Sequence, residues 1–302
     1  MRIYSKQTGF SLLELILVIV LLGILASGAG MLITTPIKAY SDQLRRTQLV
    51  DQAEMALRQI ALDIRRALPN SIRFTDNADG WALEMTNTVA GARYRDEIDG
   101  SVGATFTGSF HTLDFSQADS DFNFLGILLP GVTAIPVGQR LVIYSTAPTG
   151  FYTDVTDDDS GIVTPPLSRL TLSTLSDGDN DEQHVKIIPA FKFSQRSPGQ
   201  RAFLIDGPIS YICDSSTGIT RIDRYNDYAY QRFQPTNANL KAMAPTDVKT
   251  GTVATQVTAC SINYDPGTAQ RSGIITLSLT LEGGLAGEAI TLFQQVHVVN
   301  VP

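Results

Sequence analysis

The chain has 302 residues, which is long enough to bury one large core or two smaller ones without extensive disulfide stapling. Hydrophobic residues make up 43% of it, charged residues only 18%, and the mean hydropathy is +0.03, which excludes a disordered chain. The formal net charge of −7, together with the lack of any Lys/Arg-rich run, argues against nucleic acid as a partner.

The N-terminal segment has the composition of a membrane span. Residues 10–33, FSLLELILVIVLLGILASGAGMLI, contain one ionisable side chain, Glu14, and as a helix they reach about 36 Å, enough for a hydrocarbon core of about 30 Å. Arg2 and Lys6 precede this run, so the positive-inside rule predicts a cytoplasmic N-terminus and residues 34–302 on the other side. A cleaved secretory signal peptide is the alternative. Its apolar region is only roughly 7–15 residues long, and cleavage would leave Glu14 unexplained inside the removed part.

A recognisable motif begins this segment. It combines a short basic leader, a glycine, an aromatic residue, a glutamate and a long apolar run, in Gly9-Phe10-Ser11-Leu12-Leu13-Glu14-Leu15. This pattern resembles the class III signal of type IV prepilins and type II secretion pseudopilins. The resemblance implies that a prepilin peptidase removes residues 1–9 by cutting after Gly9, and that the new amine of Phe10 is methylated.

Glu14 needs a partner inside the membrane. An acid in a lipid-facing turn costs about 3 kcal/mol unless it is paired, so such residues are functional by default. In a filament, the Phe10 ammonium of one subunit can meet the Glu14 carboxylate of its neighbour, because each charge is unfavourable alone in a low dielectric. We expect this pair to set the axial register of assembly.

The next segment has the periodicity of an amphipathic helix. Apolar residues recur mostly every three or four positions, at Ile37, Tyr40, Leu44, Val50, Ala53, Leu57, Ile60, Ile64 and Leu68. We predict one long helix with a transmembrane half at 10–36 and an amphipathic soluble half at 37–69, ending at Pro69. Gly28, Gly30 and Pro36 would allow a bend between the halves. A short coiled coil is the alternative interpretation of the apolar stripe.

Residues 70–302 form the predicted β-rich globular domain. Predicted strands are Trp81 to Met85, Ala104 to Phe106, His111 to Phe115, Arg140 to Ser145, His184 to Phe193, Ala202 to Ile205, Ile209 to Cys213, Gly218 to Arg224, Val257 to Tyr264, Ile274 to Leu281 and Ile290 to Val301. In 274–281, alternate apolar residues indicate one buried face. The expected fold class is α+β, pilin-like, with the long helix packed on antiparallel β-sheet.

The segment 153–182 is predicted to form surface loops. Asp177, Asp179 and Asp181 have the spacing of a calcium loop, but Glu182 stands where that loop needs glycine and Ile188 where it needs glutamate. A solvated acidic turn is the favoured interpretation, and an irregular calcium site is left open.

Both cysteines fall on predicted strands. Because the domain is expected in an oxidising periplasm, Cys213 and Cys260 are predicted to form a disulfide, with two buried free thiols as the alternative.

No catalytic motif was found. The sequence lacks GxSxG, HExxH, a Walker loop and GxGxxG, and His111, His184 and His297 are expected to be sheet residues. We therefore expect no enzyme activity, no metal and no cofactor.

The C-terminal third carries a second resemblance. Gly207-Pro208-Ile209-Ser210-Tyr211-Ile212-Cys213-Asp214, the region around Cys260, residues 271–281 and the closing residues 295–302 resemble the larger minor pilins and pseudopilins of the MSHA pilus biogenesis, J-type pseudopilin and W-type minor pilin group. The resemblance implies a low-copy subunit of the bacterial inner membrane that joins other minor pilins in a tip complex.

That complex would prime assembly of an MSHA-type type IV pilus. Its expected partners are the prepilin peptidase, other minor pilins or pseudopilins and the pilus assembly platform, and the acidic domain would steer docking to basic partner subunits. The alternatives are a J-type pseudopilin of a type II secretion system and a tip adhesin that uses residues 150–182 to bind glycans.

Overall fold

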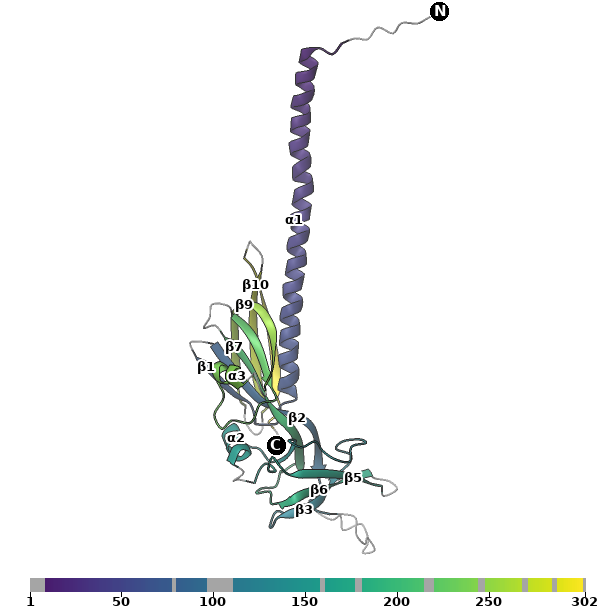
Figure 1. Cartoon of the computed structure of the whole chain (residues 1–302), viewed down its shortest axis with the longest axis vertical. Helices are drawn as coiled ribbons and strands as arrows, with labels where there is room; N and C mark the ends of the chain where they lie inside the picture. Colours follow the sequence, from purple (N-terminus) through teal and green to yellow (C-terminus); the bar gives the residue numbers. More distant parts are fainter. Residues whose placement is uncertain are drawn as a thin grey trace, which may run out of the picture.

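The computed structural model describes residues 9–77, 80–96, 111–157, 161–176, 181–214, 220–243, 248–267, 271–283 and 287–300. A single helix of 54 residues, α1 (Leu12–Arg65), extends far out of a β-rich domain (Figure 1). Two short helices, α2 (Pro148–Asp157) and α3 (Asn237–Met243), lie at the edges of that domain. This arrangement confirms the α+β class.

The strands form one antiparallel sheet. They are β1 (Arg73–Asn77), β2 (Gly80–Tyr94), β3 (Asp119–Leu125), β4 (Arg140–Ile143), β5 (Arg169–Ser176), β6 (Asp181–Phe191), β7 (Arg201–Asp214), β8 (Thr220–Asn226), β9 (Lys249–Asp265), β10 (Gly273–Gly283) and β11 (Glu288–Val298). Their order is β11-β10-β9-β8-β7-β2-β3-β6-β5, while β1 pairs with β2 and β4 pairs with β7 outside this path.

The two longest central strands, β2 and β7, pair along their whole length and divide the domain into two halves. We call the part with β1 and β8–β11 the helix half, and the part with β3–β6 the distal half. The pairing register shifts twice between Asn87 and Ala90, where one extra residue on each strand, Asp206 on β7 and Val89 on β2, bends and twists the ribbon. The distal half therefore continues past the C-terminal end of α1 (Figure 1).

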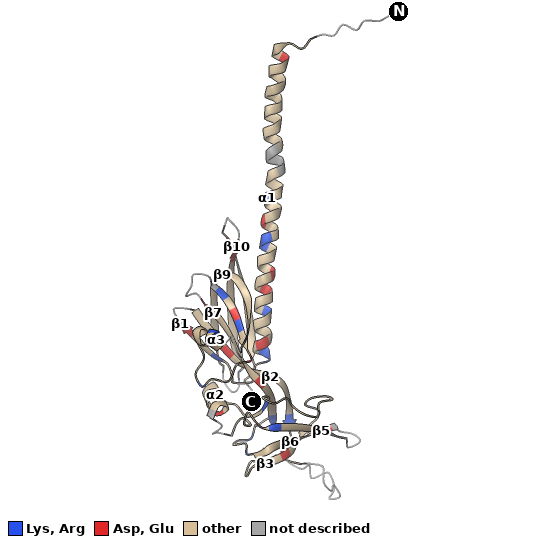
Figure 2. Cartoon of the chain, in the orientation of Figure 1, with Lys and Arg blue, Asp and Glu red and all other residues tan. Residues whose placement is uncertain are grey.

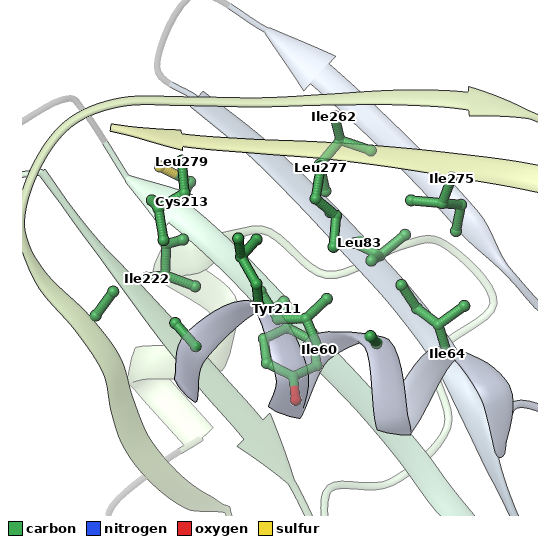
Figure 3. Packing of buried hydrophobic residues seen from close by; sticks show 14 of the residues in the cluster. Ile60, Ile64, Leu83, Tyr211, Cys213, Ile222, Ile262, Ile275, Leu277 and Leu279 are labelled. Carbon is green, nitrogen blue, oxygen red and sulfur yellow. The ribbon is translucent and has the colours of Figure 1, made fainter. Parts of the chain in front are cut away.

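The helix half holds the first core. Helix α1 packs on β9, β10 and β11, and Figure 3 shows Ile60 and Ile64 of the helix among side chains of the sheet. The predicted alternation in β10 is confirmed, because Ile275, Leu277, Leu279 and Leu281 are all buried. On α1, the buried residues are Leu49, Ala53, Ala56, Leu57, Ile60, Ala61 and Ile64.

The predicted apolar stripe on α1 is thus buried over only part of its length. Ala53, Leu57, Ile60 and Ile64 reach the core, but Ile37, Tyr40 and Leu44 are 62%, 65% and 46% exposed. The reason is length, since the sheet covers only the C-terminal part of the helix (Figure 1).

A polar contact also holds the helix on the sheet. Asp63 of α1 accepts a hydrogen bond of 2.6 Å from the Tyr211 hydroxyl and one of 2.8 Å from Arg224 Nε. Burial, with the Asp63 charge beside it, raises the pKa of Tyr211 far above its ordinary value, so the phenol stays a donor.

The distal half has its own core of aromatic and aliphatic side chains, which include Tyr94, Phe122, Phe124, Leu141, Leu170, Val185, Phe193 and Leu204. Between the halves, α2 inserts Phe151, Tyr152 and Val155 into a smaller cluster with Leu68 and Val142.

The end of α1 differs from the prediction. The helix stops at Arg65 rather than near Pro69, because the following backbone joins the sheet: Leu68 N–H donates to Thr86 O at 2.8 Å and Thr88 N–H donates to Arg66 O at 2.9 Å. Helix α1 also continues through Pro36 as one helix, without the sharp bend that the sequence allows.

Several predicted strands require correction. The predicted strands at 202–205 and 209–213 are one strand, β7, and residues 111–115 lie outside any strand. Strands β1 and β3 were missed because Asp and Asn in them weaken the strand pattern, and β5 was missed because it lies inside the acidic and proline-containing segment that was assigned to loops. The predicted strand at 104–106 lies outside the described residues.

The predicted surface loops at 153–182 are partly wrong. Their described residues include the end of α2 and all of β5, and Val155, Val163, Leu170 and Leu172 are buried. These four apolar residues are scattered among acidic and proline-containing stretches, which conceals them in the sequence.

Candidate assembly site at the N-terminal helix

The first turn of α1 positions the predicted assembly residues. Ser11 is the N-cap with extended backbone, and its hydroxyl accepts a hydrogen bond of 3.2 Å from Glu14 N–H. Ser11 and Glu14 therefore occupy the two positions of a capping box, and the carboxylate lies at the positive end of the helix dipole. Sequence analysis missed Ser11, although the Ser-x-x-Glu spacing before an apolar run is a recognised signal.

No described part of this chain covers the N-terminal half of α1. The apolar side chains from Phe10 to Leu25 that are described are exposed, with Phe10 at 84% and Leu12 at 76%. Among the described residues α1 is the one helix long and apolar enough to cross a membrane, and none of its apolar window is buried in the domain. Figure 2 shows few charged residues on this half of α1 and many beside the sheet.

The space around Gly9 and Gly28 is open. A Cβ atom added at either glycine would meet no atom within 4 Å. The described fold therefore does not itself require glycine at position 9.

The comparison with protein families gives one match. The prokaryotic N-terminal methylation motif matches residues 4–30, which contain Gly9, Phe10 and Glu14. The chain has the N-terminus of a type IV prepilin-like protein. No curated protein and no solved structure matches it.

The prepilin-like motif and the exposed helix agree with each other. The match covers residues 10–30 of the apolar run at 10–33, and the structure leaves the apolar window of α1 uncovered, as a membrane-anchored protein requires. The leader cations Arg2 and Lys6 lie outside the described residues.

The predicted disulfide is confirmed. Cys213 on β7 and Cys260 on β9 are bonded, with their Cα atoms 6.7 Å apart. Strand β8 lies between β7 and β9, but its pairing with β9 ends at Thr220 and Val257. Cys213 is itself paired with Ile222 of β8, whereas Cys260 lies past Val257, so the bond ties β7 to the part of β9 beyond its pairing with β8.

The histidines are partly as predicted. His184 lies on β6 and His297 on β11, whereas His111 precedes β3 outside any strand. The rings of His111 and His184 are 5.1 Å apart, and their Nδ1 atoms lie 2.9 Å from Asp121 Oδ1 and 2.8 Å from Asn123 Oδ1.

The structure tests the possibility of a metal site only within the described residues. No group of three or more His, Cys, Asp or Glu residues that could hold a metal ion occurs in the part of the chain that the structure describes. Asp177 and Asp179 of the open calcium question lie outside that part.

Proposed function

We propose that this chain is a minor pilin or pseudopilin that primes assembly of an MSHA-type type IV pilus as part of a tip complex. The methylation motif at 4–30 carries the proposal, because it is joined to an apolar helix that the chain leaves uncovered. In this proposal a prepilin peptidase cuts after Gly9, Phe10 is methylated, and the β-rich domain stands in the periplasm. The chain is a substrate and a structural subunit, and it has no enzyme activity of its own.

The shape of the domain supports a tip position. In a filament of this kind the long helices run side by side along the axis, so each subunit needs room for the next one beyond its own domain. Here the distal half extends past the C-terminal end of α1 (Figure 1), into the space where a further subunit would sit. A subunit at the tip has no such neighbour.

The methylation motif and the uncovered apolar helix would equally suit a J-type pseudopilin of a type II secretion system. That machine also takes up methylated prepilin-like subunits, so the two roles differ in the partner set and the exported cargo. The adhesin alternative is weakened, because Phe151, Tyr152 and Val155 from the suggested glycan-binding segment are buried in the domain.

The test is a clean deletion scored in one strain for surface pili and for extracellular enzyme secretion. We expect pili to be lost and secretion to be intact, with recovery on expression of the full chain. Lost secretion with intact pili would make the chain a J-type pseudopilin. If both were unchanged, the assembly role would be wrong.

A further inference from the structure

An open groove lies where the end of α1 meets the central ribbon of the sheet. Its volume is about 450 Å³, and it is lined by residues of four segments that are far apart in sequence. Four of the lining residues are arginines: Arg65 and Arg66 at the end of α1, Arg93 on β2 and Arg201 on β7. None of the described residues that line this groove is acidic. The chain as a whole carries a net charge of −7, so the groove is opposite in sign to the molecule around it.

Two of these arginines face each other across the central ribbon of the sheet. Arg93 and Arg201 are direct partners in the β2–β7 register, so two like charges stand opposite each other on one face of the sheet. Arg93 donates a hydrogen bond of 2.6 Å to the uncharged Gln200 side chain. Across the described ranges, no carboxylate forms an ion pair with Arg65, Arg66 or Arg93.

A purely structural role explains only part of the cluster. A helix C-terminus attracts cations, which accounts for Arg65 in the last turn of α1. It does not account for Arg93 and Arg201, which lie opposite each other on strands of the sheet. Their shared feature is that both line the same groove.

The groove also has an apolar floor. Ala67, Pro69, Phe203 and Val299 line it between the arginines, and Val299 is 54% exposed. A Cβ atom at Gly91 would come within 3.0 Å of Phe203 Cδ1, so the absence of a side chain at Gly91 lets the Phe203 ring lie over the strand. The site thus offers arginine forks for carboxylates and an apolar surface for a side chain between them.

The position of the groove excludes a lipid headgroup. The apolar run of α1 ends at residue 33, and Arg65 lies 32 residues further along the helix, about 48 Å at 1.5 Å per residue. A bilayer that holds the first half of α1 cannot reach it. A nucleic acid backbone is a poor fit as well, because the arginines surround one groove instead of following a long basic track.

We propose that this groove binds an acidic peptide segment of a partner subunit, with its carboxylates on the arginines and an apolar side chain on Phe203 and Val299. This identity of the partner rests on the proposed function, whereas the affinity of the groove for an acidic peptide does not. This basic groove would hold an acidic part of another subunit, whereas docking through the acidic surface would need a basic partner.

The test uses the full chain in a neutral detergent and a fluorescein-labelled heptapeptide of Asp, Glu and one central Phe. Fluorescence anisotropy is measured for this probe and for the same peptide with Asn and Gln in place of the acids. We expect saturable binding of the acidic probe only, weakened by added salt. The variants Arg93→Gln and Arg66→Gln should each lower the affinity by about tenfold, because charge-assisted hydrogen bonds are lost.

The matched control is Arg58→Gln. Arg58 is also on α1 and its side chain is 72% exposed, but it pairs with Glu54 and does not line the groove. The thermal midpoints of all variants are compared, so that a loss of binding is read only where folding is intact. Equal affinity for the acidic and the neutral peptide, or an equal loss in Arg58→Gln, would overturn the proposal. So would an acidic polysaccharide that displaces the peptide at equal or lower concentration.

The outcomes also separate this inference from the proposed function. Acidic-peptide binding that depends on Arg93, in a protein whose deletion affects neither pili nor secretion, would keep the groove and reject the assembly role. Loss of pili on deletion, in a protein whose wild-type chain does not bind the acidic peptide, would keep the assembly role and reject the groove.

Discussion

At the scale of single residues, the first turn of α1 gives Glu14 two separable roles. Its backbone N–H is capped by the Ser11 hydroxyl, and its side chain carries the one charge in the apolar run. The cap needs only the backbone of residue 14, so the carboxylate itself is free for contact with a second subunit.

Glu14→Gln separates these roles. We expect the variant to insert in the membrane at the normal level, because helix start and apolarity are retained, but to be nearly absent from sheared pili or the priming complex. Immunoblots of membrane and sheared fractions measure both quantities. Glu54→Gln, also on α1 but beside the sheet, is the control; normal incorporation of the Glu14 variant would contradict the register hypothesis.

Gly9→Leu tests the processing site. Because a Cβ at position 9 meets no atom within 4 Å, this change should leave the fold intact and block only the peptidase. We expect the leader to remain attached, as seen by intact-mass measurement of the purified chain. Gly28→Ala, with equally open surroundings, should be processed normally. A mature N-terminus at Phe10 in the Gly9 variant would refute cleavage control by this glycine.

His184 makes the stability of the folded domain depend on pH, and the direction of this dependence follows from its surroundings. Burial lowers the pKa of His184, and the charges of His111 and Lys186 add to this lowering while Asp121 opposes it. The folded state therefore binds fewer protons than the unfolded state below about pH 6.5, so this contribution to stability is present above that pH and is lost as the pH falls toward the folded pKa.

We expect the urea midpoint of the full chain to fall between about pH 7.5 and about pH 5.5, and to fall less in His184→Gln. His297→Gln, which removes an exposed histidine on β11, is the control. An identical pH dependence in wild type and His184→Gln would show that another group is responsible.

At the scale of elements, the docking of α1 depends on small residues. Ala53, Ala56 and Ala61 are buried against the sheet together with larger neighbours, so the helix backbone lies close to the strands. The alanines carry no strong hydrophobic signal in the sequence, yet they set the distance between the two layers.

Ala53→Leu should overpack this interface and destabilise the domain by about 1–3 kcal/mol, measured by urea unfolding of the full chain in detergent. Met55→Leu, at a site that is 71% exposed on the same helix, should change stability by less than about 0.5 kcal/mol. Equal effects of the two substitutions would mean that α1 does not pack on the sheet through this face.

The disulfide acts at the same scale, because it ties β7 to β9. The two cysteines are 47 positions apart, and closing a loop of this size is worth about 4 kcal/mol in the chain-entropy account. Replacing both cysteines by serine should lower the free energy of unfolding by roughly that amount, and reducing agent should have no further effect on the variant. A wild-type chain whose stability is insensitive to reducing agent would refute this contribution.

At the scale of the whole molecule, the chain joins a helix that is half uncovered to a domain with two cores. The helix half fixes α1 on β9–β11, and the distal half is attached through the shared strands β2 and β7. This division leaves the arginine groove at the junction, where the end of α1, β2, β7 and the segment at Val299 meet. The molecule thus has two separate surfaces proposed for contacts with other subunits: the uncovered N-terminal half of α1 and the arginine groove at the C-terminal end of that helix.

The sequence by itself determined the features that are local or unique. The apolar run, the Gly9 motif, the alternation in β10 and the pairing of the only two cysteines follow from neighbouring residues or from composition. Among the described residues, the apolar helix, the alternation in β10 and the disulfide agree with the structure, and the helix end was misplaced by only a few residues because its termination depends on contacts with β2.

Only the tertiary structure decided which surfaces meet. Glu84 is completely buried because Arg73 and Tyr228, from other segments, bond to it, and no local pattern marks it as a core residue. In the same way, Arg93 and Arg201 look like ordinary surface residues until the β2–β7 register places them side by side. Contacts of this kind depend on pairing between strands that are distant in the sequence. The local pattern of residues indicates the periodicity of each strand, but it does not indicate which strand will be its partner.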